Sequence, residues 1–88
     1  MALEKFRKRP LVVEAMRYVG ANLEQLREAF GYPFKAINDG AILVPTKEGT
    51  LAAKPGEWII RGIAGELYPC DPDIFGKTYE QVTYDEEA

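Results

Sequence analysis

The sequence predicts a small α+β domain, built from a mostly antiparallel, twisted sheet and one main helix. Three observations lead to this class. The chain has 88 residues, the size of one domain, so we expect a single domain over residues 1–88. Residues 23–30 have helical spacing, and the turn-rich segments after them are typical of short β-strands. The alternative architecture is a small, partly open β-barrel.

The helix has recognisable start and stop signals. Asn22 is a favourable N-cap, and Gln25 stands three residues later, where a capping box needs it. Apolar residues then recur at helical spacing over residues 23–30. Gly31 is suited to the left-handed conformation that ends helices, and Pro33 prevents continuation. We therefore expect one helix over residues 23–30.

The other segments predict strands joined by turns. Apolar residues on both faces of Leu11–Val19 predict a central strand covered on both sides. Asn38-Asp39-Gly40 is a hairpin signal. Asp71 is a plausible helix cap that opens a short turn, residues 73–75, ended by Gly76. The remaining expected strands are residues 34–37, 41–44, 50–53, 57–61, 66–70 and 79–84.

The charge is unevenly distributed. The net charge is −3, from 11 basic and 14 acidic residues, so binding to nucleic acid is not expected. Residues 1–35 hold seven basic and four acidic residues, net +3, whereas residues 36–88 hold four and ten, net −6. This asymmetry fits a solvated basic segment and an acidic tail. It also fits charge complementarity between subunits, or an anion site on the basic run at residues 5–9.

The composition restricts the possible chemistry. The chain has no histidine and one cysteine, which excludes Ser-His-Asp and Cys-His catalysis, histidine metal sites and an internal disulfide. We expect Cys70 to be a buried structural thiol, because no histidine base can activate it. Carboxylate pairs, Asp71 with Asp73 or Glu57 with Glu66, leave a metal-dependent hydrolase as a less favoured alternative. We expect no enzyme activity, cofactor, metal, signal peptide or membrane span.

Arginines and aromatic residues are the candidate ligand-binding groups. Arg61 ends an apolar strand before Gly62 and could fork onto a phosphate or carboxylate, or pair with Glu66 across the hairpin. Trp58 offers a stacking surface or is core, and Tyr68 could orient a polar ligand or be half-buried packing. The full set of candidate ligand-binding residues is Arg7, Arg9, Arg17, Trp58, Arg61 and Tyr68.

One long stretch carries a family resemblance. It contains Pro55-Gly56-Glu57-Trp58, then Ile59-Ile60-Arg61-Gly62, and finally Gly65-Glu66-Leu67-Tyr68-Pro69-Cys70-Asp71-Pro72-Asp73-Ile74-Phe75. These segments, with Thr78-Tyr79-Glu80 and the opening Phe6–Ala15, resemble a family of small bacteriophage and prophage proteins. That family shares a PGD-aromatic turn, an IIRG strand end and a GE-aromatic-YPC-x-PDIF segment. Here Glu57 replaces the usual aspartate and Asp71 the usual lysine.

The resemblance implies a phage-encoded protein in the host bacterial cytoplasm, without a settled activity. By analogy with other small phage proteins, we expect a non-enzymatic small-molecule-binding protein, an anti-defence sponge that sequesters a nucleotide immune signal. A nucleotide pocket of hundreds of Å³ is large for so short a chain, so we expect it between the subunits of a homo-oligomer. The alternative is a protein–protein interaction or virion-associated module.

Overall fold

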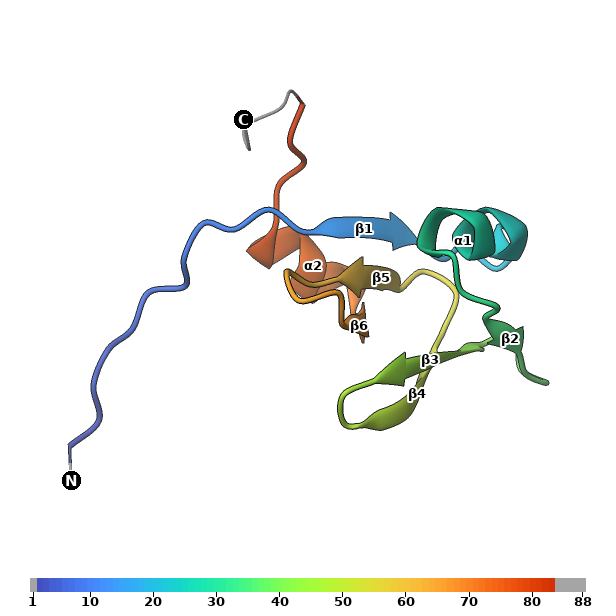
Figure 1. The fold of residues 1–88 in the computed structure, drawn as a ribbon, viewed down its shortest axis with the longest axis horizontal. Coiled ribbons are helices and arrows are strands. Elements are labelled where there is room, and N and C mark those ends of the chain that lie inside the picture. The colour runs from blue at the N-terminus through green and yellow to red at the C-terminus, as the bar shows by residue number, and fades with distance from the viewer. Residues whose placement is uncertain (1, 84–88) are drawn as a thin grey trace.

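The computed structural model describes residues 2–83 as two three-stranded antiparallel sheets and two short helices (Figure 1). The predicted α+β class is confirmed. The strands form two sheets, ordered β1-β5-β6 and β2-β3-β4, and no closed barrel within the described residues. In chain order the elements are β1 (Glu14–Arg17), α1 (Leu23–Phe30), β2 (Lys35–Ala36), β3 (Ile42–Thr46), β4 (Gly49–Ala53), β5 (Trp58–Arg61), β6 (Leu67–Cys70) and α2 (Pro72–Thr78).

The first sheet has two faces with different coverings. Residues directly opposite each other in an antiparallel pair project to the same face. One face therefore carries Ala15, Arg17, Trp58, Ile60, Tyr68 and Cys70. Helix α2 packs on this face, where its Phe75 ring stacks on Trp58. The opposite face carries Met16 and Ile59, which belong to the main core.

The main core joins the two sheets to α1. Its members are buried apolar side chains from β3, β4, β5, α1 and the connecting segments: Tyr18, Leu26, Phe34, Ile42, Val44, Ala53 and Ile59. Phe34 is fully buried, and the rings of Phe30 and Tyr32 approach it edge-on at 5.8 and 4.9 Å between centroids. Ile60 is also fully buried, but it lies on the other face of the first sheet, the face that carries Trp58 and Tyr68.

Helix α1 has the predicted bounds, but its start is built differently. Asn22 is the N-cap, yet its side chain makes no capping hydrogen bond. Its Oδ1 accepts from Val19 N and its Nδ2 donates to Arg17 O, so the side chain holds the turn that leaves β1. The predicted capping box with Gln25 is therefore wrong. Gly31 ends the helix in the left-handed conformation, with φ 61°, as expected.

The first strand is shorter than expected and lies at an edge of its sheet. The sequence predicted a central strand over Leu11–Val19, but β1 covers Glu14–Arg17, and β5 is the central strand. Leu11 and Val19 lie outside β1 and are more than half exposed. The strand has apolar residues on both faces although it lies at the edge of the sheet. Met16 packs against the main core, and Ala15 lies on the opposite face, which carries α2.

The C-terminal part also differs from the prediction. Gly76 does not end the second helix, which continues to Thr78. Asp71 starts this helix by accepting from the N–H groups of Asp73 and Ile74. A glycine inside a helix costs only about 1 kcal/mol relative to alanine, which this cap and the Phe75 packing offset. Residues 79–83 form no strand, and Tyr84 of the predicted last strand lies outside the described residues.

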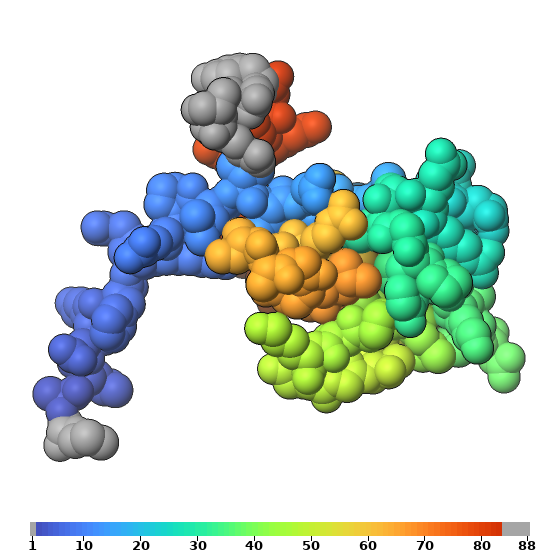
Figure 2. All heavy atoms as spheres, in the orientation of Figure 1, coloured from blue at the N-terminus to red at the C-terminus, as the bar shows by residue number. Residues whose placement is uncertain are grey.

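The N-terminal segment is an extended arm. Residues 2–10 are exposed and lead away from the body of the domain (Figures 1 and 2). The arm includes two large apolar residues, Leu3 and Phe6, which are almost completely exposed. We call residues 2–9 the basic arm, because they hold Lys5, Arg7, Lys8 and Arg9 against one acid, Glu4.

Candidate functional site

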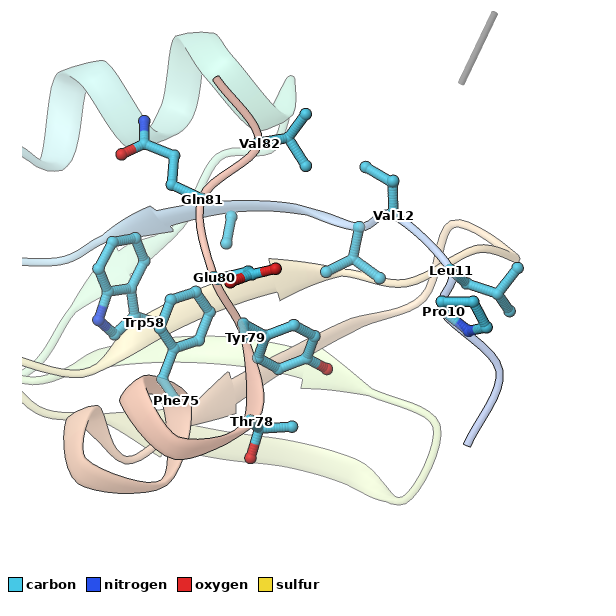
Figure 3. Close-up of a pocket in the computed structure, with 12 residues that line it drawn as sticks. Pro10, Leu11, Val12, Trp58, Phe75, Thr78, Tyr79, Glu80, Gln81 and Val82 are labelled. Atoms are coloured by element: carbon cyan, nitrogen blue, oxygen red, sulfur yellow. The ribbon is translucent and has the colours of Figure 1, made fainter. Parts of the chain in front are cut away.

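A groove beside α2 is the most site-like hollow in the described part of the chain. It has a volume of about 530 Å³, within the usual range of about 300–1,000 Å³ for ligand sites. One wall is the segment from Pro10 to Val13, and the other is the chain from Thr78 to Val82 (Figure 3). Trp58 and Phe75 form its aromatic end. We call this hollow the aromatic groove.

Three aromatic rings form a continuous stack at the groove. The rings of Trp58 and Phe75 are nearly parallel, with centroids 4.1 Å apart and an interplanar angle of 7°. Phe75 and Tyr79 continue the stack at 5.0 Å and 30°. Phe75 and Tyr79 are four residues apart, which brings both to one side of the last turn of α2. β5 therefore supplies one ring of the stack, and α2 with its C-cap supplies the other two.

Polar groups are concentrated at the Tyr79 end of the stack. The hydroxyls of Tyr68 and Tyr79 are 3.3 Å apart and share a hydrogen bond. Lys8 Nζ lies 5.2 Å from the Tyr79 ring centroid and donates to its Oη at 3.4 Å. Burial, reinforced by the hydrogen bond to Tyr79, raises the pKa of Tyr68 above its ordinary value. The Tyr68 phenol is thus available as a neutral hydrogen-bonding group beside the Tyr79 hydroxyl.

Cys70 is half-buried beside the stack, whereas the sequence predicts a buried thiol. Its Sγ donates a weak hydrogen bond to Asp71 O at 3.6 Å. Burial raises the pKa of the Cys70 thiol, and the negative charges of Asp71 and Glu57 raise it further. The thiol form is therefore favoured over the reactive thiolate, as for a structural cysteine.

Three of the four carboxylates considered for metal binding hold local structure. Asp71 caps α2. Glu57 Oε1 accepts from Lys54 N, and Glu66 Oε1 accepts from Ala64 N, so both glutamates stabilise turns. Within residues 2–83, no three His, Cys, Asp or Glu side chains gather as a metal site would require.

The structure brings some of the predicted ligand residues together and separates others. Arg17, Trp58 and Tyr68 share the face of the first sheet that carries α2. Of these, Trp58 lines the groove, and Arg17 Nε donates to Gly56 O at the neighbouring turn. Arg7 and Arg9 lie on the basic arm.

Arg61 points to the opposite face of the sheet, away from the aromatic groove. It does not pair with Glu66, as one interpretation of the sequence held. Instead it forms an ion pair with Glu14 on β1, with Nη2 to Oε1 at 2.9 Å, and its guanidinium lies 5.4 Å from the Phe30 ring centroid. Register explains this, because Glu14 is directly opposite Arg61 across the β1–β5 pair.

Sequence reasoning missed Phe75 and Tyr79 as parts of the groove, and it named Lys8 only as a member of the basic run, not as a neighbour of Tyr79. The spacing of Phe75 and Tyr79 was a usable signal, since residues four apart share one side of a helix. It was hidden by the expectation that Gly76 ends the helical turn. The position of Lys8 depends on how the arm leaves β1, which no local pattern encodes.

Comparison with known proteins found no matching family model, no similar curated protein and no similar solved structure. The two helices of the described residues are also too short and too polar to span a membrane. The geometry of the groove is therefore the basis for assigning a function.

Proposed function

We propose that the protein binds a flat, anionic small molecule of the nucleotide class in the aromatic groove and does not convert it. The observation that carries this proposal is the Trp58–Phe75–Tyr79 stack beside Lys8. Phe75 is covered by its two neighbours, so a base would stack on an outer face of the stack, that of Trp58 or that of Tyr79. Such stacking contributes about 1–3 kcal/mol per base and tolerates different bases. Lys8 supplies a positive charge at one end of that surface.

The groove volume also supports a ligand of this size. A volume of about 530 Å³ accommodates a small nucleotide, and one chain supplies it. A second subunit is therefore not required for space alone, although the exposed arm offers a means of association. In the setting implied by the family resemblance, the protein acts in the host bacterial cytoplasm as a sponge for a nucleotide immune signal.

Trp58 provides a direct test, because it is the single tryptophan and it lines the groove. We expect cyclic dinucleotides or an ADP-ribose-type nucleotide to change its fluorescence, and the ligand to be recovered intact after denaturation. The matching nucleoside, which lacks phosphate, should bind more weakly. No fluorescence change with any nucleotide of the panel overturns the proposal, and recovery of a cleaved ligand overturns its non-enzymatic part.

Charge variants locate the anion-binding end. We expect Lys8→Ala to weaken nucleotide binding by about ten- to a hundredfold, since a charged hydrogen bond contributes about 1.5–3 kcal/mol. Lys47→Ala is the matched control: it removes the same charge from an exposed turn between β3 and β4, whereas Lys8 contacts Tyr79 of the groove lining. Equal affinities of the two variants would show that Lys8 does not bind the anion.

A second candidate function is a protein-binding or virion-associated module. The observation that favours it is the basic arm with its exposed Phe6, since a large apolar side chain on an extended segment is typical of a docking peptide. Co-purification of a host or virion protein without any small molecule, followed by loss of that protein with Phe6→Ala, would favour this alternative.

A further inference from the structure

The basic arm carries an apolar anchor that its own domain leaves uncovered. Phe6 is 88% exposed and Leu3 fully exposed. Lys8 contacts Tyr79 and thereby fixes the base of the arm at the edge of the aromatic groove. The residues before Lys8 continue beyond the body (Figure 2). Residues 2–7 can span about 20 Å when extended, enough to reach another molecule.

The aromatic groove is a suitable receptor for this arm. Its lining is mainly apolar and aromatic, and its rim includes Leu11 and Val82, which are 54% and 38% exposed. The single charged residue in the lining is an acid, Glu80. An aromatic side chain flanked by cations therefore matches the groove in both polarity and charge.

The charge of the whole chain points to a second copy as the partner. The basic arm holds four basic residues and one acid, net +3, whereas residues 10–88 hold seven basic and thirteen acidic residues, net −6. Two arms would repel each other, but an arm and the body of another copy attract. Both ion pairs described in residues 2–83, Glu24–Arg27 and Glu14–Arg61, lie outside the arm.

We propose that two copies exchange their basic arms, so that Phe6 of each enters the aromatic groove of the other. Because the exchange is reciprocal, each copy placing its arm in the groove of the copy whose arm it receives, it closes with two-fold symmetry. Lys5 and Arg7 flank Phe6 and lie near Glu80 of the receiving copy. The arm then competes with any small molecule for the groove, so a bound nucleotide releases the arm. This inference does not depend on the proposed nucleotide function, because arm exchange needs no ligand.

The decisive measurement is sedimentation velocity over a concentration series of the full-length protein, without ligand. We expect wild type to dimerise, and Phe6→Ala to raise the dimer dissociation constant more than about tenfold, as loss of a buried aromatic anchor does. Val82→Arg, which puts a cation at the groove, should have the same effect. Ile74→Ala is the matched control: Ile74 is 59% exposed on α2 but does not line the groove.

Mixing the two defective variants tests the exchange itself. Phe6→Ala retains an intact groove, and Val82→Arg retains an intact arm, so together they can form one arm-in-groove contact. We expect a dimer in the mixture although each variant alone is monomeric. Trp58 fluorescence should change when wild type is diluted and should be independent of concentration in Phe6→Ala.

Three results overturn the inference. They are a wild-type monomer throughout the series, a Phe6→Ala protein that dimerises like wild type, and a mixture that stays monomeric. Co-sedimentation of monomeric wild type with anionic lipid vesicles, lost in Phe6→Ala, would assign the arm to a membrane surface instead. Failure of nucleotide binding in the Phe6→Ala monomer, whose groove is open, bears only on the proposed function.

Discussion

Removing the Asp71 cap should loosen α2 and with it one wall of the aromatic groove. Asp71 Oδ1 accepts from Asp73 N at 2.9 Å and from Ile74 N at 3.2 Å. An N-cap replaced by alanine typically costs about 1 kcal/mol, within a range of about 0.5–2. Helix α2 has only seven residues, none of them fully buried, so the cap and the Phe75–Trp58 stack are its main supports.

The expected effect of Asp71→Ala on the melting temperature follows from this N-cap energy. A loss of about 1 kcal/mol lowers the melting temperature of a domain of this size by about 4–8 °C. It also increases local opening of α2 about fivefold. The melting temperature is measured by circular dichroism, and the local effect by hydrogen exchange at Phe75, whose N–H donates to Asp71 O at 2.8 Å. Trp58 fluorescence reports whether the ring stack persists.

The matched control is Asp73→Ala. It removes the same charge from the first turn of α2, but the hydrogen-bonded group of Asp73 is its main-chain N–H, which alanine keeps. We expect a smaller effect, of about 0.3–1 kcal/mol from the helix dipole. Asp71→Asn should retain most of the wild-type stability, because asparagine is an equally good cap. Equal destabilisation by Asp71→Ala and Asp73→Ala would refute the capping argument and leave only charge.

Three further substitutions or titrations test other parts of the fold. Phe34→Ala empties a fully buried site in the core and should cost about 3–5 kcal/mol in urea denaturation; a cost below that of a surface substitution would contradict the burial. Gly31→Ala places a Cβ at φ 61° and should cost about 1–2 kcal/mol by the same measurement. The thiol of Cys70, whose pKa is raised, should titrate above 9.0 by thiolate absorbance, and Asp71→Asn should lower that midpoint. Since the thiol has the lower pKa in the unfolded protein, it loses its proton there at lower pH than in the folded protein. The free energy of unfolding should therefore fall as the pH rises above 9.0.

Local signals were sufficient to predict most of the elements. Residues 23–30 are helical as expected, because apolar spacing, Gly31 and Pro33 agree with one another. The Asn38-Asp39-Gly40 turn joins β2 and β3, and Gly62–Gly65 joins β5 and β6. In each case the evidence lies within a few residues of the structure it predicts.

Errors arose where the outcome depends on contacts distant in sequence. The apolar pattern of Leu11–Val19 indicates covering on both faces, but it does not distinguish a central strand from an edge strand covered by α2 and the core. The expectation that Gly76 ends the second helix considers only the low helix propensity of glycine. It omits the packing of Phe75 on Trp58, which lies seventeen residues earlier in the chain. The end of a short helix is decided by such packing more than by propensity.

The candidate site shows the same division between local and distant information. Trp58 and Tyr68 could be proposed from sequence because strand alternation and the hairpin place them on one face. Arg61 is one residue out of phase with Trp58 and Ile60, so the same alternation placed it on the other face, where Glu14 holds it. The position of Arg61 in the strand was therefore better evidence for where its side chain lies than its suitability as an anion-binding group. The basic arm is the opposite case, because it belongs to no helix or strand and therefore has no periodic pattern to interpret. The proposal that it binds a partner depends on its positive charge and on its exposed Phe6.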